Sequence, residues 1–463
     1  MIRFHLPGTI ASLMLPLALI RPATAGQAAL PDRVIVGYWH NFSNGSVLIP
    51  LAGIPDAFDV INVAFAEPTT FPGATMKFVP APELYRDSQG FIDDVGLIKG
   101  RGKKVLISLG GANSQVQLNT ASDIQNFVTS MKSIITTYGF DGVDIDLEGQ
   151  SLTLQDGDND FRSPSTARTL NFIAAIRALL AQFPDGLLLS AAPETAFVQG
   201  GAAAYTGVFG CYLPVIHALR QELSFVQVQH YNTGSMFGRD GTVYEPATAD
   251  FHVAMADMLL AGFNVNTADG TIFFPPLPAE KILIGLPASP DAAASGFTPD
   301  SVLHAALDYL YTGKSFGGTY HLADPRGYPK FHGLMTWSIN WDLSNNQVWS
   351  KSQRSFLDNI VLSVGTLEGN GRGAPGERPT LEQNYPNPFN PTTFIRYSLS
   401  RTTRVSLTIS DALGQEVARL VDRVQNTGEY EVRFDGSNVA SGVYFYTLRA
   451  GGLTTTKKLL LLR

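Results

Sequence analysis

The sequence predicts an α/β fold: a (β/α)8 barrel followed by a small all-β sandwich. Short apolar runs alternate with helical patterns from residue 33 to residue 364, a stretch rich in Gly, Pro and charge follows, and the remaining residues alternate polar and apolar positions between turn signals. Strands that alternate with helices are typical of a parallel sheet, and eight such units in about 330 residues indicate a closed barrel.

The expected barrel strands are apolar runs bounded by turn residues. They are residues 34–38, 60–65, 104–109, 142–146, 187–192, 225–231, 281–286 and 333–338, and candidate helices between them are residues 122–138, 165–183, 250–263, 301–311 and 351–361. A doubly wound open sheet would have a similar periodicity. However, the first strand runs into aromatic residues, where such a sheet would carry a glycine-rich dinucleotide fingerprint.

The C-terminal part of the chain has a different composition. Three prolines, Pro386, Pro388 and Pro391, precede alternating runs at residues 404–410, 430–434 and 442–449, and glycine-containing turn signals separate these runs. This pattern predicts a β-sandwich. The expected organisation is therefore a signal peptide (1–25), a barrel (32–362), a linker (363–379) and a sandwich (380–463).

Composition limits the classes of function. The chain has 463 residues, a formal net charge of −7, and 44% hydrophobic against 16% charged residues. It has ample apolar material for a large core, and the acidic balance without a basic stripe argues against nucleic-acid binding. Its single cysteine, Cys211, cannot form an intramolecular disulfide, and we expect it to be a small buried residue.

The N-terminus has the features of a secretory signal. Arg3 precedes an apolar stretch at residues 10–20, and Ala23-Thr24-Ala25 fits a small-residue cleavage site. A membrane anchor is the alternative, but the apolar run is shorter than the roughly 20 residues that a spanning helix needs. We expect export, and no other segment of the sequence resembles a transmembrane helix.

The segment 141–148 reads Asp-Gly-Val-Asp-Ile-Asp-Leu-Glu and carries the strongest functional signal. In a strand, Asp144, Asp146 and Glu148 share one face, and the three apolar residues between them share the other. Aligned acids that compete for protons are a way to keep a carboxylic acid protonated near neutral pH. In a barrel, the C-terminal strand ends carry the chemistry, which places Glu148 outermost.

A cation site or a solvated acidic loop is the alternative for these acids. A surface loop would not carry Val, Ile and Leu between the acids, so we favour a catalytic row. The nearby Asp156, Asp158 and Asp160 resemble a calcium loop only superficially, because the required glycine and closing glutamate are replaced. We expect no metal and no cofactor.

These motifs resemble glycoside hydrolase family 18, the family of many chitinases. Besides segment 141–148, the likeness includes Ser-Leu-Gly-Gly at 108–111, Gln-His-Tyr-Asn at 229–232 and Met-Thr-Trp-Ser at 335–338, and it spans about residues 32–362. The resemblance implies the same barrel. It also implies a retaining mechanism in which the N-acetyl oxygen of the substrate attacks the anomeric carbon.

The resemblance implies a role for each matched residue. Glu148 is the proton donor, Asp146 orients the substrate acetamido group and shares a proton with the donor, and Asp144 is its inner partner. Tyr231 hydrogen-bonds the acetamido carbonyl, and Trp337 forms the floor beneath the reacting sugar, although a tryptophan there could simply pack in the core.

Further substrate-binding candidates are Gln229, Tyr38, Asp141 and Glu194. Many family members carry Met and Asp where this chain has Gln229 and Asn232, a departure that bears on the pH optimum more than on activity. Asn232 could equally be a structural hydrogen-bonding residue, and Glu194 could form a plain salt bridge. The aromatic residues Trp39, Phe42 and Trp341 could either pack or extend the cleft.

The C-terminal sequence resembles the type A sorting domain of the type IX secretion system. The likeness lies in residues 381–393, which read Leu-Glu-Gln-Asn-Tyr-Pro-Asn-Pro-Phe-Asn-Pro-Thr-Thr, and in Ser-Gly-Val-Tyr-Phe-Tyr at 441–446. It implies transport through the periplasm and across the outer membrane of a Gram-negative bacterium, to the medium or the cell surface. The alternative is a chitin-binding module.

Together these observations predict a secreted, monomeric, endo-acting chitinase. Its expected partners are chitin or N-acetylglucosamine oligosaccharides and the type IX secretion machinery. Short connections between the last three barrel strands leave little room for an extra domain over the cleft, which favours endo action. The alternatives are an endo-β-N-acetylglucosaminidase acting on N-glycans and a non-catalytic chitin-binding lectin.

Overall fold

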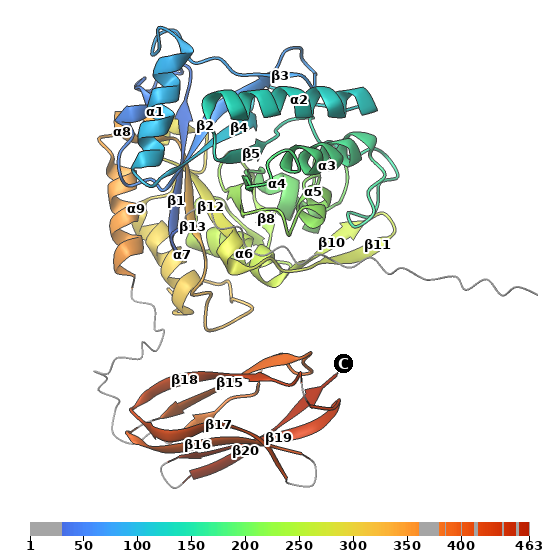
Figure 1. Ribbon diagram of the computed structural model, residues 1–463, viewed down its shortest axis with the longest axis vertical. Coiled ribbons are helices and arrows are strands. Elements are labelled where there is room, and N and C mark those ends of the chain that lie inside the picture. The colour runs from blue at the N-terminus through green and yellow to red at the C-terminus, as the bar shows by residue number, and fades with distance from the viewer. Residues whose placement is uncertain are drawn as a thin grey trace, which may run out of the picture. The chain divides into compact units, whose positions relative to one another are not determined.

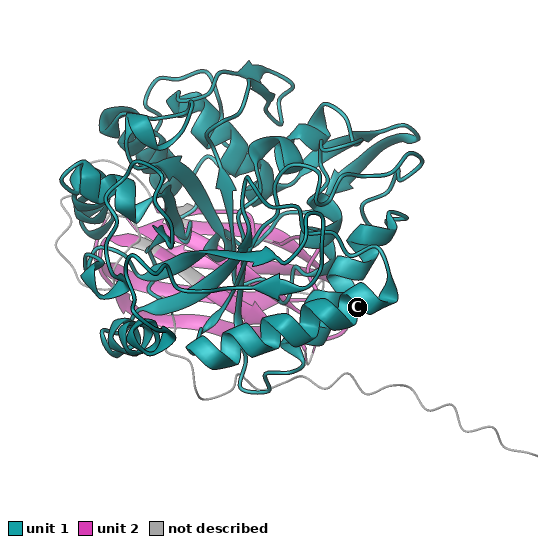
Figure 2. Cartoon of the chain, turned by 90° about the horizontal axis from the view of Figure 1, so that it is seen from above, with its two compact units in different colours: residues 1–362 teal, residues 363–463 magenta. Residues whose placement is uncertain are grey.

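The computed structural model describes residues 30–360, 379–384, 386–399, 401–411, 415–437, 439–450 and 453–462. The predicted signal peptide 1–25 and the predicted linker up to residue 378 lie outside the described residues. The chain divides into two compact units, residues 1–362 and residues 363–463 (Figure 2).

A closed parallel barrel forms the centre of the first unit. Among the described residues its eight strands are β1 (Val34–His40), β2 (Val60–Pro68), β4 (Lys104–Gly110), β5 (Gly142–Asp146), β6 (Leu188–Ala191), β7 (Phe225–Gln229), β12 (Ile282–Pro287) and β13 (Gly333–Trp337). They lie side by side in chain order, and β1 pairs with both β2 and β13. The barrel prediction is confirmed, because in an open sheet the first and last strands would not pair with each other as β1 and β13 do.

Helices surround the barrel strands (Figure 1). They are α1 (Ser88–Gly100), α2 (Ala121–Tyr138), α3 (Ala167–Leu180), α4 (Thr195–Val198), α5 (Leu213–Ala218), α6 (Ala249–Ala261), α7 (Asp300–Thr312), α8 (Ile339–Ser344) and α9 (Val348–Asn359). Local sequence explains the ends of α2. Thr120 and Asp123 form a reciprocal capping box at its start, and Gly139, with a φ of 71°, ends it.

The predicted helix at residues 250–263 ends two residues early, for a steric reason. Gly262 has a φ of +81°, and a Cβ there would lie 2.6 Å from the carbonyl oxygen of Phe274. The chain therefore leaves α6 at this glycine and enters the antiparallel hairpin of β10 (Phe263–Thr267) and β11 (Gly270–Phe274). The sequence analysis did not anticipate this hairpin, nor helices α1 and α5.

Two separate apolar clusters pack against the two faces of the barrel strands. The inner cluster fills the barrel interior toward the N-terminal ends of the strands and includes Val36, Val60, Leu106 and Met335. A larger cluster lies between the outer strand faces and the helices. Because side chains alternate along each strand, the same eight strands contribute residues to both clusters. The polar residues of the barrel interior lie closer to the C-terminal ends of the strands than the inner apolar cluster does.

The second unit is an all-β fold of two antiparallel sheets, as predicted. One sheet has the order β14 (Thr380–Leu381), β15 (Thr392–Leu399), β18 (Gly428–Asp435), and the other β17 (Glu416–Gln425), β16 (Thr403–Ser410), β19 (Gly442–Ala450), β20 (Leu453–Leu461). Ile395, Leu407 and Tyr446 are fully buried in a core of its own.

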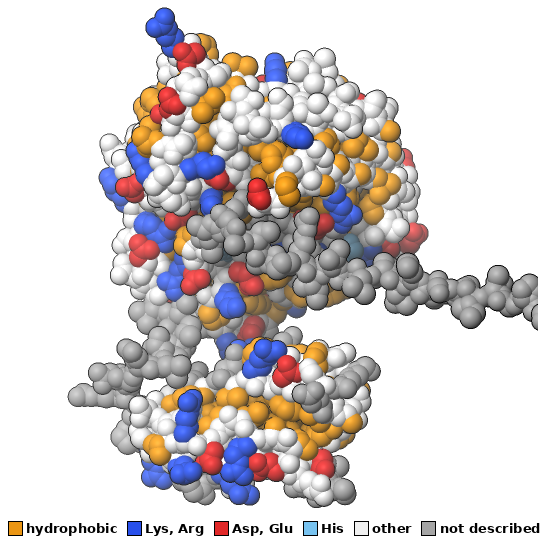
Figure 3. Space-filling view, in the orientation of Figure 1, with side chains coloured by type: hydrophobic (Ala, Val, Ile, Leu, Met, Phe, Trp, Pro, Cys, Tyr) orange, Lys and Arg blue, Asp and Glu red, His pale blue; other side chains and the backbone are white. Residues whose placement is uncertain are grey.

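Surface charge in both units is mixed. Figure 3 shows Lys and Arg interspersed with Asp and Glu on the face in view, without a continuous basic stripe. Across the part of the chain that the structure describes, no helix has both the length and the apolar character needed to cross a membrane.

Candidate active site

The acid-bearing strand β5 has two chemically different faces. Val143, Ile145 and Leu147 are buried in the outer apolar cluster. Asp144 and Asp146 therefore point into the barrel, where both are buried, with exposed fractions of 0% and 2%. Glu148 lies two residues beyond the C-terminal end of the strand, at the rim where barrel enzymes carry their chemistry.

Asp144 is surrounded by hydrogen-bond donors. Its Oδ2 accepts from the hydroxyls of Tyr38 at 2.5 Å and Ser108 at 2.8 Å, and its Oδ1 accepts from the Ser190 hydroxyl at 2.6 Å and the Gln227 amide at 2.9 Å. Burial raises the pKa of Asp144, and these hydrogen bonds oppose the shift. Four donors that converge on two oxygens favour the ionised carboxylate.

Asp146 and Glu148 form a coupled pair above it. Burial raises the pKa of Asp146 well above its usual value, and the charges of Glu148 and Asp144 raise it further. Burial also raises the pKa of Glu148. A hydrogen bond joins the two carboxyls, which requires a proton on one of them. The pair thus retains a proton where separate carboxyls would lose it.

Gln229 joins this pair to the next strand but one. Its Nε2 donates to Asp146 Oδ1 at 3.0 Å, to Glu148 Oε1 at 3.2 Å and to the Ala192 carbonyl at 2.9 Å. An amide at this position supplies a donor without adding a fourth carboxyl to the cluster. Gln229 therefore fixes the orientation of both acids and leaves the proton with them.

Tyr231 lies just beyond β7 and is buried beside the acids. Burial, with the charges of Asp146 and Glu148 as the next causes, raises its pKa well above 10, so its hydroxyl stays a neutral donor. Behind it, His230 stacks on His252 with ring Nδ1 atoms 3.2 Å apart, and His252 Nε2 lies 2.9 Å from the Thr298 hydroxyl. Burial lowers the pKa of both imidazoles, which keeps this support neutral.

An aromatic platform lines the side of the rim formed by β1, β2 and β13. The Trp337 ring lies 4.6 Å from His40, 5.5 Å from Tyr38 and 5.9 Å from Phe65, measured between centroids. Phe42 stacks on His40 and is 36% exposed. A flat apolar surface of this kind suits the C–H face of a pyranose ring.

Two glycines bring the backbone of β4 against the acid strand. Gly110 has a φ of +106°, and a Cβ there would lie 2.2 Å from the Asp146 carbonyl oxygen. Gly111 donates its N–H to the same oxygen at 2.7 Å, and a Cβ there would meet the Phe65 ring at 2.7 Å. The Gly-Gly pair of segment 108–111 is therefore a packing requirement of the site.

Glu194 lies directly after β6, at the start of α4, and its backbone bridges to Gln229. Burial, with the charge of Glu148 as the second cause, raises its pKa to about 7. Its side chain thus faces the acid pair, and no ion pair of Glu194 occurs among the described residues, so the salt-bridge alternative finds no support.

The structure gathers eight of the nine expected site residues in the barrel interior and at the rim above it. Asp141 is the exception: it precedes β5 at the opposite end of the barrel, where its carboxylate pairs with Lys99 at 3.0 Å and accepts from the Val105 N–H. We therefore leave Asp141 out of the site.

Residues left open by the sequence also take definite positions. Asn232 Oδ1 accepts a hydrogen bond from the Ser295 N–H at 3.1 Å, so Asn232 is a structural hydrogen-bonding residue, the alternative left open by the sequence. Trp39 is fully buried and donates to the Ile49 carbonyl, so it packs in the core. Cys211 is buried, as expected.

Three contributors were missed by the sequence analysis: Ser190, Gln227 and His252. The period of two along residues 225–229 could have placed Gln227 on the same face as Gln229. Nothing local marks Ser190 or His252, which lie on other elements. Within the described residues, no cluster of three or more His, Cys, Asp or Glu is arranged to hold a metal ion.

Comparison with known proteins gives two family matches. A sequence model of glycosyl hydrolases family 18 matches residues 34–358, and a model of a secretion system C-terminal sorting domain matches residues 383–462. The two matches correspond to the two compact units.

Individual relatives are similar over the barrel. "Chitinase D" of Niallia circulans is 52% identical over 70% of this chain, and "Probable class II chitinase" of Arthroderma benhamiae is 42% identical over 68% of this chain and 96% of its own length. The crystal structure of a family 18 chitinase from Chromobacterium violaceum aligns with a TM-score of 0.66, at 34% identity, over 74% of this chain and 91% of that one. The chain spans 62% of the length of the Niallia relative.

Proposed function

The chain belongs to glycosyl hydrolase family 18, and from this membership we propose that it is an endo-acting chitinase that cleaves β-1,4-linked N-acetylglucosamine polymers with retention of configuration. The observation that carries the proposal is the row of Asp144, Asp146 and Glu148, which runs from the buried barrel interior to the rim and in which burial raises the pKa of every member. Most retaining glycosidases use a second carboxylate as nucleophile, whereas family 18 enzymes use the substrate's own N-acetyl group.

Glu148 acts as general acid in the first step. The proton held by the Asp146–Glu148 pair passes through Glu148 to the glycosidic oxygen, and the bond to the leaving sugar breaks. Its position at the rim and its raised pKa both support this role. A correctly placed acid of this kind contributes typically about 100- to 10,000-fold to the rate.

Asp146 acts on the attacking group. Once ionised, it accepts the N–H of the substrate acetamide, which makes the carbonyl oxygen a better nucleophile toward the anomeric carbon. The oxazolinium ion that forms is positive, and the adjacent carboxylate stabilises it. The Tyr231 hydroxyl donates to the acetamide carbonyl, and Trp337 supports the sugar ring.

Asp144 supports these steps from beneath Asp146. Its four donors favour the ionised carboxylate and oppose the effect of burial. That charge favours keeping a proton on the outer pair before cleavage. In the second half, Glu148 removes a proton from water, the hydroxide opens the oxazolinium ion, and the pair regains its proton.

The test compares Glu148→Gln with a matched Glu83→Gln control at an exposed position. On chitohexaose we expect the first variant to lose at least about 1,000-fold in kcat while still binding the oligosaccharide, and the control to match wild type. NMR should show the β-anomer as the first product, with cleavage inside the chain. Efficient release of glycans from a high-mannose glycopeptide would instead favour the endo-β-N-acetylglucosaminidase alternative, and an inactive wild type the lectin alternative.

We further propose that the second unit addresses the protein to the type IX secretion system of a Gram-negative bacterium. The family match of residues 383–462 supports this role. The proposed route leads through the periplasm to the medium or the cell surface. A chain truncated before residue 380 should accumulate in the periplasm with full activity. Weaker retention of that truncated chain on insoluble chitin would favour the chitin-binding alternative.

A further inference from the structure

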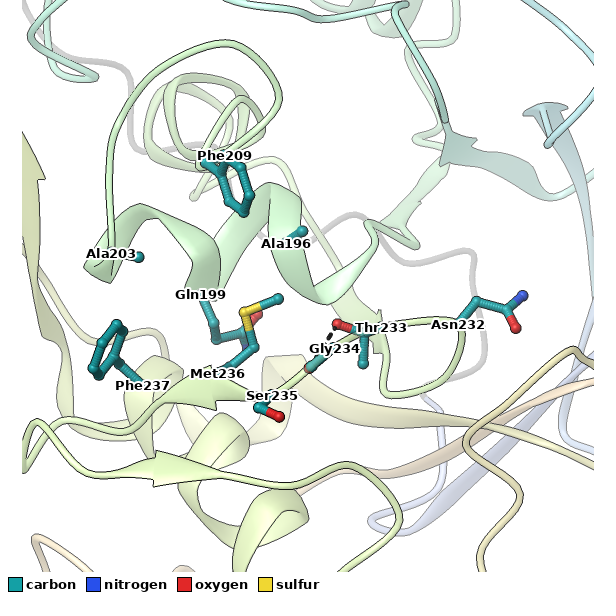
Figure 4. Close-up of a pocket in the computed structure, with 10 residues that line it drawn as sticks. All are labelled: Ala196, Gln199, Ala203, Phe209, Asn232, Thr233, Gly234, Ser235, Met236 and Phe237. Carbon is teal, nitrogen blue, oxygen red and sulfur yellow. Dashed lines mark hydrogen bonds between the residues drawn. The ribbon is translucent and has the colours of Figure 1, made fainter.

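A pocket lies on the β6–β7 side of the barrel rim. It has a volume of about 350 Å³, within the range of small-molecule sites. Its walls come from α4 and the following 3-10 turn, from the loop before α5, and from residues 232–237 after β7 (Figure 4). The first two segments follow β6 and the third follows β7, so all of them lie at the C-terminal strand ends, on the face of the barrel that carries Glu148.

One buried polar atom of the pocket wall has no partner. Gln199 is 1% exposed, and its Nε2 donates to the Met255 carbonyl at 3.0 Å. This bond fixes the orientation of the amide, so Oε1 points away from Met255, and it has no hydrogen-bond donor among the described residues. A buried carbonyl oxygen without a donor is costly, and a ligand N–H would satisfy it.

The remaining wall is mainly apolar. Phe209 and Phe237 are each 41% exposed, so both rings present apolar surface to a ligand in the pocket. Gly200 admits the Phe209 ring, because a Cβ there would lie 2.7 Å from it. Figure 4 shows the Gln199 amide beside the Met236 thioether, and an unbranched methionine side chain can shift to admit a ligand.

The position of the pocket relates it to the leaving group. Its lining begins at Ala196, two residues after Glu194, and at Asn232, immediately after Tyr231, so the pocket is built from the loops that follow two residues of the site. The aromatic platform around Trp337 lies across the barrel, on β1, β2 and β13. A sugar chain that rested on that platform and crossed the mouth of the barrel would reach β6 and β7 on the opposite side.

We propose that this pocket binds an acetamido group of the sugar units on the leaving-group side, and so selects acetylated over deacetylated units there. The acetamide N–H donates to Gln199 Oε1, its methyl group packs against Met236 and Phe209, and the sugar face lies on Phe237. A free amine, charged near neutral pH, would lose solvation against these apolar walls. The inference rests on the proposed chitinase activity.

Partially deacetylated chitosan tests the proposal, because each cut creates two new ends. The new reducing ends report the reacting unit, and the first two units of the new non-reducing ends report the leaving side. For wild type we expect the reducing ends to be acetylated and the leaving-side units to be at least threefold enriched in acetyl groups over the substrate. Gln199→Met, which keeps length but loses the acceptor, should abolish the second enrichment and retain the first.

Phe237→Ala provides a second variant at a partly exposed site that folding does not require. It should raise KM for chitohexaose at least fivefold, whereas Phe273→Ala, a 52% exposed ring on the β10–β11 hairpin, should leave KM unchanged. Wild-type leaving-side units that match the substrate's composition would overturn the pocket assignment alone. Reducing ends without acetyl enrichment would overturn the proposed function itself.

Discussion

The middle of the barrel interior and its rim differ in how many side-chain hydrogen-bond donors they offer to a carboxyl group. In the middle, Asp144 accepts hydrogen bonds from four side chains on four different strands. At the rim, Asp146 and Glu148 share a single side-chain donor, Gln229, and one another. Both regions are buried, so burial alone does not decide protonation. The number of donors differs as well, and we expect this contrast to favour a charge on Asp144 and a mobile proton on the outer pair.

The largest expected effect comes from Asp146→Asn. It removes the carboxylate that orients the acetamide, so kcat should fall about 100- to 10,000-fold. The folded-state pKa of Asp146 is raised, so wild type loses stability as pH rises from about 4 through that pKa, and the variant does not. Its melting temperature should therefore exceed that of wild type increasingly between pH 4 and pH 8.

The matched variant Asp144→Asn should behave in the opposite way. Its new amide nitrogen would face donors that now converge on oxygen, so the melting temperature should drop at pH 7. Thermal scans of both variants across the pH range would decide the matter. Two stabilised variants, or two destabilised ones, would show that the middle and the rim do not differ as described.

A smaller effect is expected from Ser190→Ala, which removes one of the four donors to Asp144. A hydrogen bond to a charged group contributes about 1.5–3 kcal/mol, so the free energy of unfolding should fall by about that amount at pH 7. The loss should be smaller at pH 4, because the raised pKa of Asp144 favours its protonated form as the pH falls. Without this donor the pKa of Asp144 should rise further, and kcat should fall.

Urea unfolding at both pH values measures this loss. Ser114→Ala is the control, since the buried Ser114 hydroxyl has no hydrogen-bond partner among the described residues. Equal losses in the two variants would mean that Ser190 only fills space.

The smallest effect is expected from Glu194→Gln at the rim. Ionised Glu194 raises the pKa of Asp146, and its own pKa is about 7. Removing the charge should move the alkaline limb of the kcat profile to lower pH, by less than about one unit because the side chain is partly solvated. The variant should also gain stability relative to wild type as pH rises through 7. A pH–rate profile that is unchanged would contradict this electrostatic link.

The sequence was sufficient to predict what depends on local periodicity. The alternation in segment 141–148 placed the acids inside the barrel and Val143, Ile145 and Leu147 outside it, and both placements agree with the structure. The eight strands were located within a few residues, because each is a short apolar run with glycine or polar residues at its ends.

Contacts between side chains on strands that are distant in the sequence could not be predicted in this way. The donors around Asp144 come from positions 38, 108, 190 and 227, and a serine or glutamine on a buried strand carries no mark of its partner. Asp141 shows the converse: it belongs to the same motif as Glu148, but a strand of five residues separates them and carries them to opposite ends of the barrel. The pocket likewise depends on two loops that meet only in the fold.

Among the residues that the structure describes, the two units have separate apolar cores: two clusters in the barrel and one in the sandwich, with no residue in common. Neither core relies on the other for apolar burial, so neither half is needed to complete its neighbour. The C-terminal unit could therefore be joined to a different catalytic domain, and the barrel to a different C-terminal domain, without altering either apolar core.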